Sequence, residues 1–256
     1  MKENEKYLVP ALIRGLKILE LFTPEKNELT LSEISLAIDI NRSSAFRLLQ
    51  TLEYSGYLSR TDKKTYILNI KTLQLGYSTL ANFSINEKAV PYMKELRDQT
   101  KMAVHLSILD NTDIVYINNI QAIGAFTSNI RIGTRWPAHA TVIGQFLLSN
   151  LSNEEIINRY EKFNEWSQYS QSTPMNLDQL LEKVEKSRKS EFLISWGQFK
   201  NTMTASAVPI KSKKDGSINY VLSVSYPSTY INKENYEKEI IPLLLKTAED
   251  ISFYIT

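Results

Sequence analysis

Residues 29–59 read LTLSEISLAIDINRSSAFRLLQTLEYSGYLS, and this stretch decides the fold of the N-terminal part of the chain. Thr30 with Glu33 three residues later predicts a capping box, which satisfies free backbone N–H groups at a helix start. Apolar side chains then recur at helical spacing and give this helix one buried face. Asn41 is a favourable N-cap for a second helix, and the apolar positions after it follow the same period. The stretch therefore predicts two short amphipathic helices joined by a polar turn.

A glycine and a basic hairpin follow the second predicted helix. Gly56 stands where a residue in the left-handed conformation would end a helix, and TDKKT at residues 61–65 forms the tip of the hairpin. Between Arg42 and Lys71 the chain carries six cations and two anions, a net charge of +4, although the whole chain carries only +2. A local basic patch of this kind follows a phosphate backbone. This order of elements is typical of a winged helix-turn-helix, and double-stranded DNA is the expected partner.

The predicted DNA-contact residues gather at the start of the second helix and in the hairpin, because the start of that helix contacts bases in helix-turn-helix proteins. Arginines there can bind guanine edges or phosphates. The spacing by itself also allows a simpler interpretation, in which the two helices only pack a core. The full predicted set is Thr30, Ser32, Arg42, Ser43, Ser44, Phe46, Arg47, Arg60, Lys63 and Lys64.

Composition narrows the class of protein. A chain of 256 residues, 43% hydrophobic and 23% charged, suits two ordinary globular domains. It contains no cysteine, which excludes disulfides and thiolate metal sites, and His105 and His139 lie too far apart for metal-ligand spacing. We expect no metal and no cofactor. No run approaches the ~20 apolar residues of a membrane span, and the polar residues 1–6 are unlike a secretory signal, so we expect no membrane partner and a cytoplasmic location.

The remainder of the chain predicts a linker and an α+β domain with a mostly antiparallel sheet. Ser84 with Glu87 is expected to cap a helix at the domain boundary. Strands are expected at residues 104–109, 114–117, 124–130, 205–210 and 220–225. Further capping boxes are expected at Ser152 with Glu155 and at Asn176 with Gln179, and a last helix at residues 233–254.

Taken together, these motifs resemble the IclR family of transcriptional regulators. The resemblance rests on stretches in the family's order over nearly the whole chain. They are VPAL at 9–12, LTLSEI at 29–34, RSSAFRLLQTL at 42–52, GYL at 56–58, YIL at 66–68, GTRWPAHATVIG at 133–144, and LSVS at 222–225 followed by Pro227.

The resemblance implies a winged helix-turn-helix domain at residues 6–69, a linker helix at 70–84 and an effector-binding and oligomerisation domain at 85–256. The last of these is expected to have a GAF-like or profilin-like antiparallel sheet flanked by helices. The implied function is a sequence-specific regulator, by default a repressor, whose operator affinity changes when a small organic effector binds. A homodimer or tetramer on a pseudo-palindromic operator is the expected assembly.

The effector positions that the resemblance implies are Val142, Ile143, Ser195, Ala205, Ser223 and Ser225. Ser223 and Ser225 alternate along a strand, so both hydroxyls point to one sheet face; an alternative is that they face solvent on an outer strand.

The sequence departs from the family pattern around these effector positions. Many members carry an acidic cluster where SWGQ stands at 195–198, a cysteine where Ala205 stands, and glycine-lysine where Gly144 and Gln145 stand. With Trp136, Trp196 and Phe199 nearby in sequence, these losses favour an effector larger or more apolar than a short keto acid.

The sequence also allows two alternative functions. His139 close to Thr141 suggests a base and a nucleophile, but G-x-S-x-G, Walker and G-x-G-x-x-G motifs are absent, so we expect no catalytic residue. A ligand-independent DNA-binding assembly protein would leave the ~170 residues after the linker without a purpose, since a small assembly module needs fewer.

Overall fold

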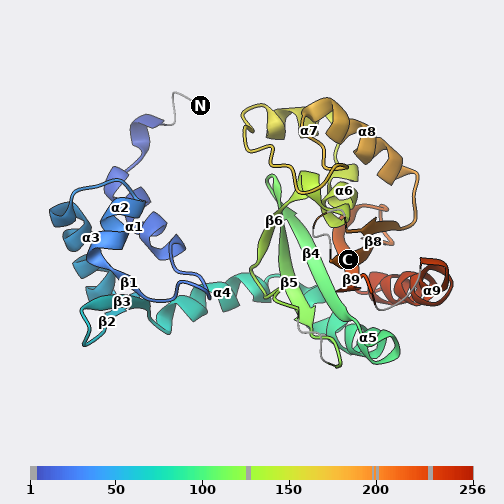
Figure 1. The fold of residues 1–256 in the computed structure, drawn as a ribbon, viewed down its shortest axis with the longest axis horizontal. Coiled ribbons are helices and arrows are strands. Elements are labelled where there is room, and N and C mark those ends of the chain that lie inside the picture. Colours follow the sequence, from blue (N-terminus) through green and yellow to red (C-terminus); the bar gives the residue numbers. More distant parts are fainter. Residues whose placement is uncertain (1–4, 125–127, 198, 200–201, 230–232, 256) are drawn as a thin grey trace. The chain divides into compact units, whose positions relative to one another are not determined.

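The computed structural model describes residues 5–255 except 125–127, 198, 200–201 and 230–232. The chain divides into two compact units, Met1–Asn82 and Phe83–Thr256. Figure 1 draws the first unit in blue to cyan and the second in green to red. Among the described residues, the structure contains no helix that is both long enough and apolar enough to span a bilayer.

The N-terminal unit combines helices with a small antiparallel sheet. Its elements are η1 (Glu5–Tyr7), α1 (Pro10–Glu20), β1 (Leu29–Thr30), α2 (Leu31–Ala37), α3 (Arg42–Tyr54), β2 (Leu58–Arg60), β3 (Thr65–Leu68) and α4 (Lys71–Ala81). Strand β3 lies between β1 and β2 and pairs antiparallel with both. Ile18 of α1, Ile34 of α2 and Leu49 of α3 are buried in one core with Leu58 and Tyr66 of the hairpin. This is the winged helix-turn-helix that the sequence predicts.

Local hydrogen bonds explain why the helices of this unit begin and end where they do. The backbone N–H of Glu33 donates to Thr30 Oγ1 at 3.2 Å, and the N–H of Thr30 donates to Glu33 Oε2 at 2.7 Å, which completes the predicted capping box. The N–H of Ser44 donates to Asn41 Oδ1 at 2.8 Å at the start of α3. Gly56 follows α3 with φ +79°, in the left-handed region. These local predictions are confirmed.

The second unit is built on a six-stranded antiparallel sheet with the order β6-β5-β4-β9-β8-β7. Its elements are α5 (Ser84–Thr100), β4 (Ala103–Asp110), β5 (Asp113–Ile120), β6 (Arg135–Pro137), η2 (Ala138–Ala140), α6 (Val142–Ser149), α7 (Asn153–Tyr160), α8 (Leu177–Arg188), β7 (Leu193–Trp196), β8 (Met203–Lys211), β9 (Ile218–Pro227) and α9 (Lys233–Ser252). The expected α+β architecture is confirmed.

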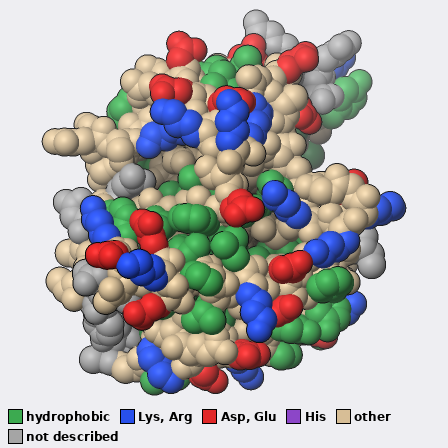
Figure 2. All heavy atoms as spheres, turned by 90° about the vertical axis from the view of Figure 1, so that its right-hand side faces the viewer, with side chains coloured by type: hydrophobic (Ala, Val, Ile, Leu, Met, Phe, Trp, Pro, Cys, Tyr) green, Lys and Arg blue, Asp and Glu red, His purple; other side chains and the backbone are tan. Residues whose placement is uncertain are grey.

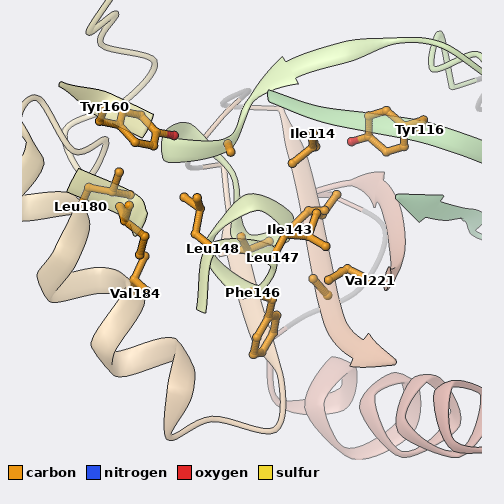
Figure 3. Close-up of a cluster of buried hydrophobic side chains, with 14 of the residues drawn as sticks. Ile114, Tyr116, Ile143, Phe146, Leu147, Leu148, Tyr160, Leu180, Val184 and Val221 are labelled. Atoms are coloured by element: carbon orange, nitrogen blue, oxygen red, sulfur yellow. The ribbon is translucent and has the colours of Figure 1, made fainter. Parts of the chain in front are cut away.

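Helices cover both faces of this sheet, and Figure 1 shows α6, α7 and α8 grouped apart from α5 and α9. On one face, Tyr236 of α9 bonds Ser206 Oγ and stacks on Tyr226, with ring centroids 4.9 Å apart. On the other face, α6 lies between the sheet and α8. Figure 3 shows the α6 side chains pointing into the cluster they share with both neighbours; its labelled members are Ile114, Tyr116, Ile143, Phe146, Leu147, Leu148, Tyr160, Leu180, Val184 and Val221.

The start of α6 is held tightly against the preceding turn. The N–H of Gly144 donates to Thr141 Oγ1 at 3.0 Å, which caps the helix. A Cβ at Gly144 would lie 2.1 Å from the carbonyl oxygen of Ala138, so no larger residue fits without movement of the backbone. Glycine therefore allows η2 and α6 to approach closely, and this approach fixes where the start of α6 lies over the sheet.

Two local predictions for this unit are wrong. The strand expected at 124–130 is absent from its described residues, since 128–130 are irregular and 125–127 lie outside the described chain. On the side away from β4, β5 pairs instead with β6, after a turn in which Gly133 N–H donates to Tyr116 O at 2.8 Å. Helix α5 begins at Ser84 with Phe83 as its N-cap and no side-chain cap, so Ser84 does not cap it.

The two capping boxes expected in the second unit have different outcomes. Ser152 and Glu155 form theirs at α7 as predicted. At α8, Asn176 accepts from the N–H of Gln179, but Gln179 Oε1 accepts from the N–H of Met175 at 2.8 Å instead of from Asn176. The second half of that predicted box is therefore wrong.

Candidate DNA-contact surface and effector site

The start of α3 presents a polar face to solvent. Arg42, Ser43 and Arg47 are exposed and Ser44 is half-buried, whereas Ala45 on the opposite face is fully buried. The helix is therefore fixed in rotation by its apolar stripe, and the residues predicted to contact DNA lie on the outward side.

Most of the cations that are predicted to contact DNA form no ion pair in the described structure, so they are available to bind an anion. In the described parts of the chain, no ion pair involves Arg42, Arg47, Lys63 or Lys64. Arg60 lies over Tyr66, with its guanidinium carbon 5.9 Å from the ring centroid. These side chains make the start of α3 and the hairpin tip an exposed positive surface.

Lys71, counted in the sequence-based charge excess, is engaged elsewhere. Its Nζ donates to the carbonyl oxygen of Ser55 at 2.8 Å and lies 4.9 Å from the Tyr57 ring centroid. A lysine at this place satisfies a carbonyl at the end of α3. Lys71 therefore contributes less to the positive surface than the sequence-based charge count suggests.

The remaining residues that are predicted to contact DNA differ in their exposure and hydrogen bonding. The hydroxyl of Thr30 is used in the capping box. Ser32 is exposed. Phe46 is 42% exposed although it is a large apolar residue. An exposed aromatic ring beside free arginines can make apolar contact with a thymine methyl group.

Four of the six predicted effector residues lie on one face of the larger sheet. Ser195, Ala205 and Ser225 are direct partners across β7, β8 and β9, and Ser223 lies in the next row on the same side. Directly opposite residues of an antiparallel pair point to the same face. Because Ala207 and Val221 on this side belong to the core cluster that contains Val142 and Ile143, this face is the one covered by the start of α6.

The sheet position of Ser223 and Ser225 decides between the two interpretations of the sequence. Strand β9 lies between β4 and β8 in the middle of the sheet. Ser223 is 1% exposed and Ser225 is 8% exposed. The alternative that these serines face solvent on an outer strand is therefore wrong.

His105 belongs to the same face, and the sequence-based prediction missed it. It is the direct cross-strand partner of Ser223, and its Nε2 lies 2.9 Å from Ser225 Oγ. Burial lowers the pKa of His105 to about 4, and nearby Asn119 only partly opposes the shift. The imidazole is therefore neutral at pH 7. The alternation of VHLSIL at 104–109 was a usable hint, because it places two polar residues on one face of an apolar strand.

Aromatic rings continue outward from His105. Ring centroids are 5.3 Å apart for His105 and Tyr116, 5.3 Å for Tyr116 and Trp136, 4.6 Å for Trp136 and Phe199, and 4.6 Å for Phe199 and Tyr169. We call Tyr116, Trp136, Phe199 and Tyr169 the aromatic band. It provides a ring-lined wall next to the buried serines and the histidine.

Trp196 does not belong to this wall, although the sequence suggested that it did. Its ring lies 5.4 Å from that of Tyr236 in α9, and the ammonium of Lys233 is 5.2 Å from its centroid. Since Ser195 points to the α6 face, its strand neighbour points to the opposite face.

The surroundings of His139 indicate a structural role in core packing. Its buried ring packs against both Phe163 and Trp166, with centroids 5.3 and 5.1 Å away, and burial lowers its pKa. Thr141, the nucleophile of the enzyme hypothesis, uses its hydroxyl as the N-cap of α6. Within the described residues, the structure contains no group of three or more His, Cys, Asp or Glu side chains that could hold a metal ion.

The surface of the second unit has no dominant sign of charge on the face drawn in Figure 2, where Lys and Arg side chains alternate with Asp and Glu. In α8, Lys186 pairs with Glu182 at 2.7 Å, and Arg188 pairs with Glu185 at 2.9 Å. Such exposed pairs add little stability. They pair cations of α8 with carboxylates, whereas no ion pair in the described structure involves the predicted contact cations of the N-terminal unit.

Comparison with known proteins identifies the family of the chain. Residues 11–62 match the IclR helix-turn-helix domain, and residues 77–253 match the family described as bacterial transcriptional regulator IclR C-terminal. The chain is 30% identical over 207 residues to the HTH-type transcriptional regulator XynR of Escherichia coli, which corresponds to 79% of this chain and 81% of XynR.

Solved structures show the same architecture. An IclR family transcriptional regulator from Brucella abortus is 28% identical, with a TM-score of 0.78 over 100% of this chain and 96% of that one. An IclR homolog from Microbacterium hydrocarbonoxydans, crystallised with 4-hydroxybenzoate, is 20% identical, with a TM-score of 0.80 over 96% of this chain and 98% of that one; it shows the fold alone. This chain therefore belongs to the IclR family of transcriptional regulators, with an N-terminal helix-turn-helix DNA-binding domain and a C-terminal effector-binding domain.

Proposed function

We propose that this regulator is a cytoplasmic repressor that binds a pseudo-palindromic operator as a dimer or a pair of dimers, without a cofactor, and responds to an aromatic effector. The proposal rests on the observation that one chain contains two features. One unit exposes uncommitted cations at the start of α3 and the hairpin tip, and the other buries polar groups beside an aromatic band.

The proposed DNA contacts divide into two kinds. Ser43, Ser44 and Arg47 lie where α3 would enter the major groove, so they would contact base edges. The phosphate contacts would come from Arg42, Arg60, Lys63 and Lys64. Thr30 and Ser32 at the start of α2 and Phe46 on α3 complete the proposed surface.

Replacement of Arg47 tests the proposed base contact. An arginine bound to a guanine edge contributes about 1–3 kcal/mol of discrimination, so Arg47→Ala should lower operator affinity about tenfold or more and relax base preference. Lys17→Ala, an exposed cation on α1, is the matched control. Fluorescence anisotropy with the DNA upstream of the chain's own gene measures both. Unchanged affinity and base preference in Arg47→Ala would remove this residue from the contact set.

The proposed effector is aromatic and larger or more apolar than a short keto acid. Support comes from the aromatic band, which adjoins the buried row of Ser195, Ala205 and Ser225. The ligand 4-hydroxybenzoate in the Microbacterium homolog belongs to this chemical class. A thermal-shift screen should find stabilisation by aromatic acids, since a ligand that binds only the folded state stabilises it. Stabilisation by short keto acids alone would contradict this proposal.

Exposed apolar side chains on the N-terminal unit support a homodimer. Leu12 and Leu16 of α1 are 62% and 52% exposed, and Tyr7, Leu8 and Val9 just before them are 79%, 54% and 57% exposed. Contiguous exposed apolar residues mark protein interaction sites, and a second copy provides an identical face for a two-fold contact. Homodimer formation would also match the two half-sites of a palindrome.

Sedimentation velocity tests this proposed interface. Leu12→Glu together with Leu16→Glu should shift the protein to a smaller species, because the charges would have to be buried in the contact. Leu36→Glu, on an 83% exposed residue of α2, is the matched control and should leave the oligomer intact. The same sedimentation coefficient for all three proteins would place the contact elsewhere.

A further inference from the structure

Four polar side chains form a buried cluster under α6. We call His105, Ser107, Ser223 and Ser225 the His105 cluster. His105 faces Ser223 directly across β4 and β9, and Ser107 and Ser225 each lie two residues along the same strands. Residues at this spacing point to one face, so all four side chains lie on the side of the sheet that α6 covers.

Three atoms of this cluster lack a hydrogen-bond partner among the described residues. They are His105 Nδ1, Ser107 Oγ and Ser223 Oγ. Their residues are 1%, 0% and 1% exposed, respectively. Buried polar groups in folded proteins nearly always have a partner, and an unpaired one costs about 1–3 kcal/mol. Three such atoms together indicate a place where a bound molecule supplies the missing bonds.

The chemistry of the cluster selects the group that would bind. A neutral imidazole has one donor nitrogen and one acceptor nitrogen, and each serine hydroxyl both donates and accepts. A hydroxyl group on a ligand has the same dual character, and it fits whichever tautomer His105 adopts. A carboxylate only accepts, and no member of the His105 cluster carries a positive charge to offset its burial.

We infer that the His105 cluster is the polar recognition point of the effector site and that it takes the hydroxyl of a phenolic effector whose ring lies along the aromatic band. The inference rests on the proposed aromatic effector. Tyr116 connects the two parts, since its ring is 5.3 Å from His105 and 5.3 Å from Trp136. Ser225 holds the imidazole through Nε2, so Nδ1, which is unpaired in the described structure, would contact the ligand, with Asn119 near the ring as a further polar group.

The two histidines of the chain make a direct test possible by NMR. In protein labelled with ¹⁵N-histidine, the ring nitrogens of His105 and His139 give separate signals. Addition of 4-hydroxybenzoate should shift the His105 nitrogens, Nδ1 most, and by more than those of His139, which packs against Phe163 and Trp166 and lies 6.4 Å from Tyr169 of the aromatic band. Saturation of the ligand without any change at His105 would overturn the inference.

Calorimetry on the full chain tests the preference for a hydroxyl. Benzoate differs from 4-hydroxybenzoate only by that group, and it should bind at least ~10-fold more weakly, because it leaves the cluster unpaired. His105→Phe and Ser223→Ala should remove this difference. Ser206→Ala is the matched control: this buried serine points to the opposite sheet face and bonds Tyr236, so its loss should leave the preference intact. Circular dichroism confirms the fold of each variant.

The possible results distinguish a failure of this inference from a failure of the proposed aromatic effector. Equal binding of both compounds, or a hydroxyl preference that survives in His105→Phe and Ser223→Ala, overturns the inference while an aromatic effector stands. If neither compound binds, both the aromatic effector and the inference fail, and the cluster holds only trapped water.

Discussion

Neutralising the hairpin tip is the most quantitative test of the DNA-contact surface. Lys63 and Lys64 are exposed, lie at the turn between β2 and β3, and form no ion pair in the described structure. Lys64 adopts a left-handed backbone conformation, with φ +63°. Its replacement should therefore be a side chain similar to lysine, so that the conformational preference of the backbone at the turn stays the same. Lys63→Gln with Lys64→Gln removes both charges and retains most of the side-chain length.

The expected size of the effect follows from counterion release. On B-DNA each phosphate contact contributes about −0.9 to the slope of log K against log salt. Two lost contacts should flatten the slope by ~1.8 for one protomer and by ~3.6 for a dimer on both half-sites. Across a fourfold change in salt, the larger value corresponds to about two powers of ten in affinity. The slope therefore reports the contacts and the number of protomers together.

The assay is fluorescence anisotropy of labelled operator over a salt series, with a random duplex measured in parallel. Affinity for both duplexes should fall by a similar factor, because phosphate contacts carry no sequence information. Lys238→Gln with Lys246→Gln on α9 is the matched control and should leave the slope unchanged. An unaltered slope in the hairpin variant, or a loss confined to the operator, would refute the assignment of these lysines to phosphates.

Two further predictions concern stability. Gly144→Ala would put a Cβ 2.1 Å from Ala138 O, so we expect the free energy of unfolding to fall by about 3 kcal/mol; Gly15→Ala, whose Cβ meets nothing within 4 Å, should raise it by ~0.5–1 kcal/mol. Calorimetry that finds equal effects would contradict the close approach. Burial lowers the pKa of His105 to about 4, below its unfolded value of about 6.5, so the unfolded state binds this proton first as pH falls. The stability that a neutral His105 provides should be complete above pH ~6.5 and be lost toward pH ~4, by up to ~3 kcal/mol. Urea unfolding over this range should show a smaller pH dependence for His105→Phe, and an unchanged one would show that His105 is not the group responsible.

Features set by neighbours in sequence could be predicted, and features set by strand register could not. The capping boxes of Thr30 with Glu33 and Ser152 with Glu155 span three residues each, so the sequence contains all of their chemistry. The predicted strand at 124–130 failed because the partner of β5 depends on a turn and a pairing that local propensity does not encode.

The effector face shows the same limit. His105 and Ser225 are 120 residues apart, and only the pairing of β4 with β9 brings them together. The position of Trp196 could have been predicted, because it follows Ser195 in a strand and must point to the other face. The engagement of Lys71 with Ser55 could not, since it depends on how the start of α4 packs against the end of α3.

The central claim is that effector binding in the second unit changes operator affinity of the first. The direct measurement is the operator Kd of the full chain, by anisotropy, with and without saturating 4-hydroxybenzoate, together with the ligand Kd of the free and DNA-bound chain. Linkage requires the two ratios to be equal, and a repressor released by its effector predicts weaker operator binding by about fivefold or more. A ligand that binds while the operator Kd stays unchanged would contradict the account.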